Sequence, residues 1–342
     1  MRMHVFTIAS AMLSLLACGV ACGGTADRSD EGAAEGALIG GGVPAMAQRQ
    51  ELKPVVYLGR CTATKVGPRH FLTAAHCILA ESALTPFPGK EISIEMSNYE
   101  DGPYVDRVER QRWPFLEHIS LDEPWQEACK IWSVSDDQQN RCRTVGFTRN
   151  AQAYTGGASD VALVVMKDLA PPTQSGEVNH SVRDLPEIPV TTKALVAGEA
   201  VTLAGYGCSG DAAAPPSWLR NNILRIGATK VVDGNASVGA VSDDWKQLGA
   251  RYLFTENVSS LCAGDSGGPV LVKRGAAGRQ AWAVAGVHAG FTTQGNYNVL
   301  ANWHTRLDDG AKIRPKNANP AQGAPETSMG DWLRAEGATV LP

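Results

Sequence analysis

Hydrophobic residues occur along most of the chain in short runs, and glycine, proline and polar residues separate one run from the next. Short apolar runs between turn residues are typical of β-strands, and little of the chain has the periodicity of a helix. This pattern predicts an all-β fold of the sandwich or barrel type. Strands are predicted over residues 55–58, 61–66, 70–73, 92–96, 161–166, 200–204, 223–232, 252–255, 269–272 and 281–288.

Two segments interrupt the strand pattern in the middle and near the end of the chain. Residues 170–189 are polar and proline-spaced, which is typical of a crossing between two half-domains. Residues 328–336 (SMGDWLRAE) are the best candidate for a helix, and Ser328 is placed to cap its N-terminus. The pattern therefore adds a short C-terminal helix to the β-fold.

A third segment, residues 102–157, is rich in Asp, Gln, Arg and Trp. Cys129 and Cys142 lie close together in this segment and flank a polar run, so we interpret it as a surface insertion held by a local disulfide. Its aromatic residues fit either an exposed binding patch or a small core stapled by that disulfide. These aromatic residues are Trp113, Trp125 and Trp132.

Composition excludes several classes of protein. The 342 residues are 44% hydrophobic and 19% charged, which fits two globular domains or one double-barrel domain. The net charge of −4 provides no basic surface for nucleic acid. We expect no metal and no other cofactor, because the histidines that are not assigned a role below lack metal-ligand spacing. These are His70, His118, His180, His288 and His304.

The N-terminus has the pattern of a signal peptide over residues 1–22. A basic start precedes an apolar core at residues 5–16, and small residues follow. Export would permit disulfides. Residues 15–18 (LLAC) also resemble the bacterial lipoprotein signal, in which Cys18 would carry the lipid, with Cys22 as a weaker candidate. A lipid there would be the only membrane attachment that we expect. Residues 23–38 are small, polar and acidic, and they predict a flexible pro-segment or linker.

Three short segments carry side chains that could perform chemistry. Ser266 lies in a glycine-rich turn, residues 264–269 (GDSGGP), where glycines allow close backbone approach. His76 follows a β-type run, and Asp160 begins an apolar strand. Each residue alone fits an ordinary structural role. A nucleophilic serine, however, needs a base, a carboxylate and an oxyanion site, and the three segments together could supply them.

Taken together, the three segments resemble the trypsin/chymotrypsin family of serine peptidases. Residues 73–77 (TAAHC), 160–163 (DVAL) and 264–269 match the family's motifs in the family's order, His then Asp then Ser. Residues 205–207 (GYG) and 38–41 (LIGG) match two further segments. The resemblance covers roughly residues 38–342.

The resemblance implies the fold and the chemistry. The fold would be two antiparallel six-stranded β-barrels of the chymotrypsin-like type, about residues 39–180 and 190–342, within one domain at 39–342. Ser266 would be the nucleophile, His76 its base and Asp160 the orienting carboxylate, with an oxyanion hole at the N–H groups of Gly264 and Ser266. We therefore expect a monomeric serine endopeptidase that acts on proteins or peptides. The alternative is an inactive homologue that serves as a binding or adhesion module.

The resemblance also suggests the disulfides. It places a disulfide beside the histidine, between Cys61 and Cys77. With Cys129 paired to Cys142, Cys208 would pair with Cys262, because loops carrying these residues lie side by side in this fold. That last pair departs from the family's usual partner for the cysteine near the serine, since no cysteine follows residue 290.

Activation and specificity follow from the same resemblance. Asp265 would pair with the α-amino group freed at Leu38 or Ile39 when an unknown protease removes the pro-segment. The residue before the cut would be uncharged, which argues against a trypsin-like activator. The substrate pocket would be formed by Ser260 at its base and by Gly290 and Phe291 in its wall. These residues predict a preference for an uncharged, apolar or small side chain before the scissile bond.

Overall fold

The computed structural model describes about half of the chain, and more than half of the described residues are in strands. Described are residues 43–44, 49–58, 61–79, 92–97, 108–113, 116–122, 159–166, 185–207, 224–232, 251–259, 261–262, 264–276, 279–294, 298–316 and 325–342. All of them belong to one of two compact units, residues 34–342. Among them, no helix combines the length and the apolar character that crossing a membrane requires.

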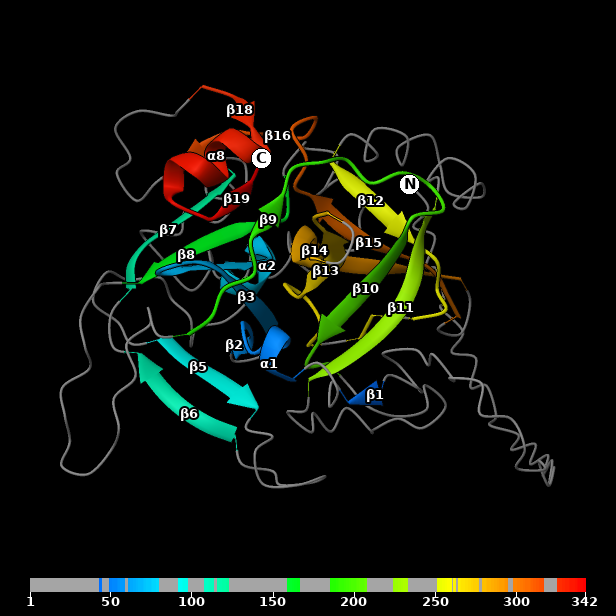
Figure 1. Ribbon diagram of the computed structural model, residues 1–342, viewed down its shortest axis with the longest axis horizontal. Coiled ribbons are helices and arrows are strands. Elements are labelled where there is room, and N and C mark those ends of the chain that lie inside the picture. The colour runs from blue at the N-terminus through cyan, green and yellow to red at the C-terminus, as the bar shows by residue number, and fades with distance from the viewer. Residues whose placement is uncertain are drawn as a thin grey trace, which may run out of the picture. The chain divides into compact units, whose positions relative to one another are not determined.

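One sheet closes into a six-stranded barrel (Figure 1). Its strands pair in the order β13-β10-β11-β12-β15-β14, and β14 pairs again with β13. All six contacts are antiparallel, so the second half of the chain forms a barrel without a free edge. The barrel strands are β10 (Ala200–Gly205), β11 (Arg225–Val232), β12 (Tyr252–Thr255), β13 (Pro269–Arg274), β14 (Ala281–Gln294) and β15 (Asn298–Arg306).

The other large sheet has eight strands, in the order β17-β7-β8-β4-β3-β2-β5-β6. Its strands are β2 (Val55–Leu58), β3 (Cys61–Gly67), β4 (His70–Thr73), β5 (Ile92–Ser97), β6 (Val108–Trp113), β7 (Leu116–Asp122), β8 (Ala162–Met166) and β17 (Pro315–Lys316). The helix α1 (Arg49–Leu52) precedes β2, and α2 (Ala75–Leu79) follows β4.

The two sheets exchange terminal segments. β1 (Val43–Pro44) pairs with β11 of the barrel, whereas β17, from the end of the chain, pairs with β7 of the first sheet. β9 (Val190–Thr191) and β19 (Val340–Leu341) extend the barrel sheet, and β16 (Lys312–Ile313) pairs with β18 (Thr327–Ser328). The C-terminal segment therefore ties the two halves of the fold together.

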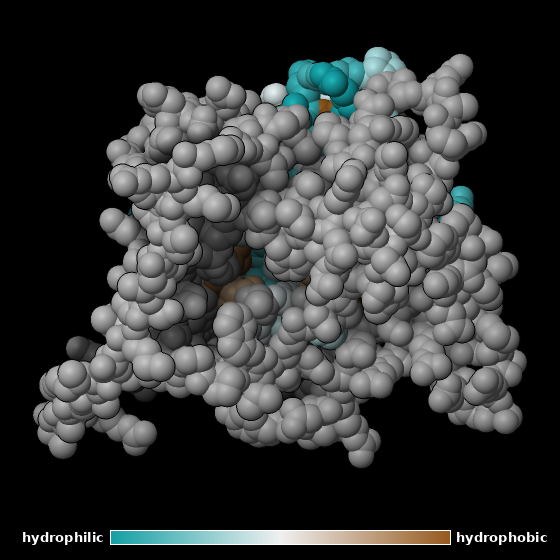
Figure 2. Space-filling view, turned by 180° about the vertical axis from the view of Figure 1, so that it is seen from behind, coloured by the Kyte–Doolittle hydropathy of each residue, from teal (hydrophilic) through white to brown (hydrophobic). Residues whose placement is uncertain are grey.

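The C-terminal helix is confirmed. Helix α8 (Met329–Glu336) starts at Ser328, whose side chain accepts a hydrogen bond from Asp331 N at 3.0 Å. It ends at Gly337, which has a left-handed φ of 94°. Trp332 is buried in the larger hydrophobic core, which includes residues of both sheets. In Figure 2, the largest visible group of hydrophobic described residues lies near the centre of the view, beside hydrophilic ones.

The interpretation of residues 102–157 as a surface insertion is wrong where this segment is described, because β6 and β7 belong to the first sheet. Ile119 and Leu121 of β7 are fully buried. The polar residues that alternate with them misled the prediction, because Ser120 and Asp122 are also buried and bind groups from the C-terminal segment. Cys129, Cys142, Trp125 and Trp132 lie outside the described residues.

Candidate functional site

His76 and Asp160 form a buried pair beside two neighbouring strands of the first sheet. His76 lies in α2, just after β4, and Asp160 lies two residues before β8, which pairs with β4. Asp160 Oδ2 is 2.7 Å from His76 Nδ1, and Asp160 Oδ1 accepts from His76 N at 3.0 Å. A carboxylate accepts, so Nδ1 carries the ring proton and Nε2 is left as the basic nitrogen.

Electrostatics at this pair favour a basic imidazole. Burial disfavours the imidazolium, but the charge and the hydrogen bond of Asp160 outweigh that effect and raise the pKa of His76. Nε2 lies 3.8 Å from the sulfur of Cys77. Cys77 forms the predicted disulfide with Cys61, so neither sulfur is a thiolate that could bind a metal beside His76.

The backbone of Asp160 is held by the second barrel. Its N–H donates to the hydroxyl of Tyr252 at 3.2 Å, and its carbonyl accepts from Thr305 Oγ1 at 2.8 Å. Its carboxylate points to the first sheet, while its main chain is bound by β12 and β15. Asp160 thus lies where the two sheets meet.

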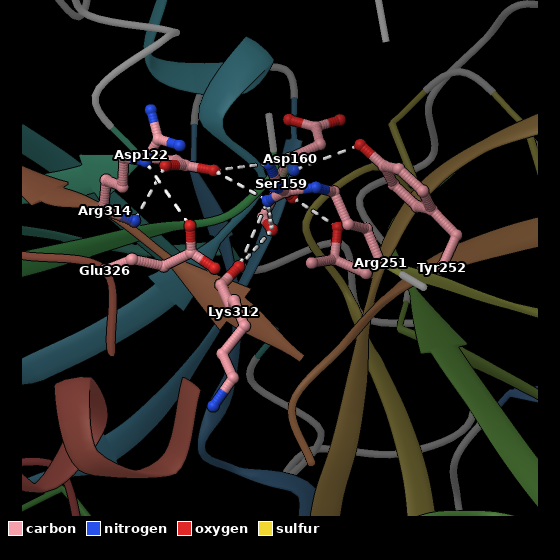
Figure 3. A network of polar contacts seen from close by, with 9 residues as sticks. Asp122, Ser159, Asp160, Arg251, Tyr252, Lys312, Arg314 and Glu326 are labelled. Atoms are coloured by element: carbon pink, nitrogen blue, oxygen red, sulfur yellow. Dashed lines mark hydrogen bonds and ion pairs between the residues drawn. The ribbon is translucent and has the colours of Figure 1, made fainter. Parts of the chain in front are cut away.

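A second buried carboxylate, Asp122, lies to one side of Asp160 and is linked to Ser159 (Figure 3). Asp122 Oδ2 accepts from Ser159 N at 2.7 Å, and Oδ1 accepts from Arg314 N at 3.0 Å. Arg251 Nη1 lies 3.4 Å from Asp122 Oδ2 and donates to Ser159 Oγ at 3.3 Å. Burial raises the pKa of Asp122, against the effect of these donors. This network fixes the residue that directly precedes Asp160.

The backbone N–H groups of the serine turn fall into two sets. The N–H groups of Asp265, Gly267 and Gly268 donate to carbonyls within the protein. Those of Gly264 and Ser266 donate to no group in the described part of the chain. Gly264 and Gly267 have φ angles of 106° and 82°, a left-handed conformation that other residues rarely adopt.

The same turn packs directly against the histidine segment. A Cβ on Gly267 would lie 2.1 Å from Thr73 Oγ1 and 3.0 Å from Ala74 N, so only glycine allows this approach. The carbonyl of Ser266 accepts from Thr62 N at 2.8 Å. Ser266 itself is half-buried.

A disulfide connects this contact with the histidine. Thr62 follows Cys61, which is bonded to Cys77, the neighbour of His76, and the two Cα atoms are 6.0 Å apart. The structure therefore brings Ser266 to the His76 segment. No hydrogen bond joins the Ser266 hydroxyl to His76 in the described part of the protein.

A comparison with protein-family models matches residues 117–305 to the family described as Trypsin. This match covers more than half of the chain. The chain belongs to the trypsin family. No curated protein sequence matches it. The family match includes Asp160 and Ser266 and begins after His76, which is placed by the geometry above. The family and the closed barrel confirm the expected chymotrypsin-like double-barrel fold and a domain of the serine peptidase type.

In this trypsin-family chain Asp265, next to the serine, is fully buried. Its carboxylate accepts from Gly207 N at 2.8 Å and from Cys262 N at 2.9 Å. Gly205 and Gly207 make room for it, since a Cβ on either would come within 2.3 Å of its oxygens. Burial raises the pKa of Asp265 to about 6, although both N–H donors and Arg225 lower it. A further cation beside this carboxylate would stabilise its charged form and lower its pKa.

A buried pair of histidines in the barrel was not anticipated. His288 Nδ1 and His304 Nδ1 lie 3.0 Å apart, His288 Nε2 lies 3.2 Å from the carbonyl of Ala204, and His304 Nε2 lies 3.0 Å from Thr255 Oγ1. A carbonyl only accepts, so His288 Nε2 donates and its Nδ1 accepts from His304 Nδ1. Thr255 then donates to His304 Nε2. Burial lowers the pKa of His288 to about 3, and burial and His288 lower that of His304, so both are neutral.

Asn302 extends this polar network to the segment around residue 260. Its Nδ2 donates to Thr255 Oγ1 at 3.2 Å and to Ser259 O at 2.7 Å, and its Oδ1 accepts from Leu261 N at 2.9 Å. The sequence alone could not reveal this network, because His288 and His304 become neighbours only through the register of β14 and β15.

Several predicted site residues remain untested. Cys262 is disulfide-bonded, and its partner is outside the described residues. Gly290 is described and has open space where a Cβ would be. The side chain of Phe291 is not described. Also outside the described residues are Cys18, Leu38, Ile39, Cys208 and Ser260.

Proposed function

We propose that the protein is a serine endopeptidase in which Ser266 is the nucleophile, His76 the general base and Asp160 the orienting carboxylate. The observation that carries this proposal is the buried His76–Asp160 pair, with 2.7 Å between Nδ1 and Oδ2, beside a serine turn in contact with the histidine segment. The pair leaves the basic Nε2 for the serine proton.

The chemistry proceeds in two steps. His76 Nε2 takes the proton of Ser266 while Oγ attacks the peptide carbonyl, and the carbonyl oxygen becomes an oxyanion. The N–H groups of Gly264 and Ser266 stabilise that oxyanion, each by about 3–4 kcal/mol. His76 then protonates the leaving amine, and water hydrolyses the acyl-enzyme by the same sequence. Asp160 stabilises the imidazolium throughout, which agrees with the raised pKa of His76. Catalytic hydrogen bonds are often long in free enzymes, so we expect the Ser266–His76 bond to form on substrate binding.

Labelling by a fluorophosphonate probe tests this proposal. The probe should modify the mature protein at Ser266, and Ser266→Ala or prior heat denaturation should abolish labelling. A folded mature protein that is not labelled would contradict the peptidase proposal and favour the alternative, an inactive homologue that serves as a binding module.

We propose further that the chain is made as a zymogen with Asp265 as the switch. The buried carboxylate has a raised pKa and would gain from the α-amino group of a new terminus at Leu38 or Ile39. The residue before the cut would be Ala37 or Leu38, so the activating protease would not be trypsin-like. Active enzyme whose N-terminal sequence starts far from these residues would refute this switch.

For specificity we propose an uncharged apolar or small side chain before the scissile bond. Ser260 provides no carboxylate to bind Lys or Arg, and Phe291 would narrow the pocket beside Gly290. Substrates with Ala, Leu or Phe at this position should therefore be cleaved faster than an Arg substrate. The reverse order would overturn the assignment of the pocket.

Export through the signal at residues 1–22 is proposed as well, because disulfides persist in oxidising compartments. Cys18 would be the site of a lipid anchor. The mass of the mature protein distinguishes the possibilities, since a lipidated Cys18, a plain signal cleavage and a terminus near residue 38 give three different masses.

A further inference from the structure

We propose that Thr62 is a positioning residue for the oxyanion hole, which it holds in place through the carbonyls of Gly264 and Ser266. This inference rests on the proposed function, because it assigns a role in the same site. Thr62 lies in β3 of the first sheet and is fully buried.

The contacts of Thr62 include the two residues whose N–H groups would form the oxyanion hole. Its Oγ1 donates to Gly264 O at 2.8 Å, and its backbone N–H donates to Ser266 O at 2.8 Å. Its Oγ1 also accepts from Tyr206 N at 3.0 Å. A hydroxyl has one proton and two lone pairs, so one side chain can make both of its bonds at once.

These bonds restrict the groups that must point at the oxyanion. Gly264 lacks a Cβ and has a φ of 106°, so its own conformational preference fixes its N–H only weakly. The bond from Thr62 to the Gly264 carbonyl restricts the peptide that follows Gly264. The backbone is also closely packed there, since a Cβ on Gly264 would lie 3.1 Å from Gly207 Cα and 3.3 Å from Tyr206 O. Ser266 is held in the same way through its own carbonyl. Thr62 thus attaches the serine turn, which precedes β13 of the barrel, to β3 of the first sheet and limits the motion of the turn.

Thr64 provides a matched control on the same strand. It is also buried, at 1% exposure, but its Oγ1 has no hydrogen-bond partner among the described residues. Substitution of Thr by Val removes the hydroxyl and keeps the shape at both positions. Only at Thr62 does it leave a buried carbonyl and a buried N–H without their partner.

The experiment compares Thr62→Val, Thr62→Ser and Thr64→Val in the mature enzyme. We expect Thr62→Val to lower kcat by about tenfold to a hundredfold, with KM nearly unchanged, since misplaced oxyanion donors affect the transition state. The inhibition constant of a peptide aldehyde, which forms an oxyanion adduct, should rise by the same factor. Thr62→Ser keeps the hydroxyl and should retain most of the activity, and Thr64→Val should match the wild type.

Three outcomes would overturn the proposal. Thr62→Val could match Thr64→Val in kcat and in aldehyde binding, Thr62→Ser could be as slow as Thr62→Val, or kcat could fall only in proportion to the folded fraction measured by unfolding. A wild type that neither cleaves peptides nor reacts with a fluorophosphonate would instead refute the proposed function. Hydrogen exchange of the Tyr206 N–H then still tests the contacts of the Thr62 hydroxyl with Tyr206 and Gly264. The exchange rate should increase in Thr62→Val and not in Thr64→Val.

Discussion

Replacing Asp265 by Asn in the unprocessed chain should change how the stability of the protein depends on pH. The Asp265 carboxyl is buried, and its pKa rises from 3.8 to about 6. Its charged form is therefore disfavoured in the folded protein relative to the unfolded chain. The protonated Asp265 carboxyl contributes stability that is fully present below pH 3.8 and is lost as the pH rises through about 6. Over this range the unfolded chain binds fewer protons at this group than the folded protein does.

The magnitude follows from the size of the shift. A rise of about 2 pKa units corresponds to about 3 kcal/mol of unfolding free energy at neutral pH, at 1.36 kcal/mol per unit. Asn has nearly the same shape and cannot ionise, so the unfolding free energy of the variant does not decrease through this group as the pH rises. Other groups with shifted pKa values, such as His76 and Asp122, are shared by both proteins and cancel in the difference.

Urea unfolding at a series of pH values measures the effect. Both chains carry Ser266→Ala, which prevents self-cleavage. The unfolding free energy of the Asp265→Asn variant minus that of the protein with Asp265 should increase by about 2 kcal/mol or slightly more between pH 4 and pH 7, most of the full change. A difference that stays constant across this range would refute the reasoning. In processed protein the difference should shrink or reverse, since a nearby α-ammonium group would lower the pKa of Asp265.

Three further substitutions test other parts of the site and the fold. Gly267→Ala should abolish activity and lower the melting temperature, because its Cβ would lie 2.1 Å from Thr73 Oγ1 and φ is 82°. Wild-type activity would contradict the tight contact between turn and histidine segment. Trp332→Ala should lower the urea-unfolding free energy by about 3–5 kcal/mol, since the side chain is fully buried, and a loss below 1 kcal/mol would contradict its place in the core. Asp122→Asn should lower kcat by about tenfold through a shift of the Asp160 backbone, whereas Asp308→Asn, another buried carboxylate that binds an arginine, should not. Equal kcat values would remove Asp122 from the support of the site.

Local patterns were enough to predict most strands and the C-terminal helix. Strands β2, β4 and β12 begin and end at the predicted residues, and a turn residue lies close to at least one end of each run. Strand β7 was missed because its polar residues are buried by partners far away in sequence. Ser120, for example, binds Trp332 and Glu336 of the C-terminal helix. Alternation along one strand cannot reveal such partners.

The site shows the same division. Motifs next to His76, Asp160 and Ser266 are short, so the sequence alone suggested these three residues. Thr62 carries no such signal. It is a threonine in an ordinary strand, and only the packing of two distant loops gives its hydroxyl two partners.

The most direct test of the central claim is the turnover rate of Ser266→Ala, His76→Ala and the double variant on one peptide substrate. Residues that act as one catalytic unit lose nearly all of their effect when either is removed. The account predicts that all three variants share the same residual kcat, orders of magnitude below the wild type. A double variant that is slower by the product of the two single losses would contradict a Ser266–His76 unit.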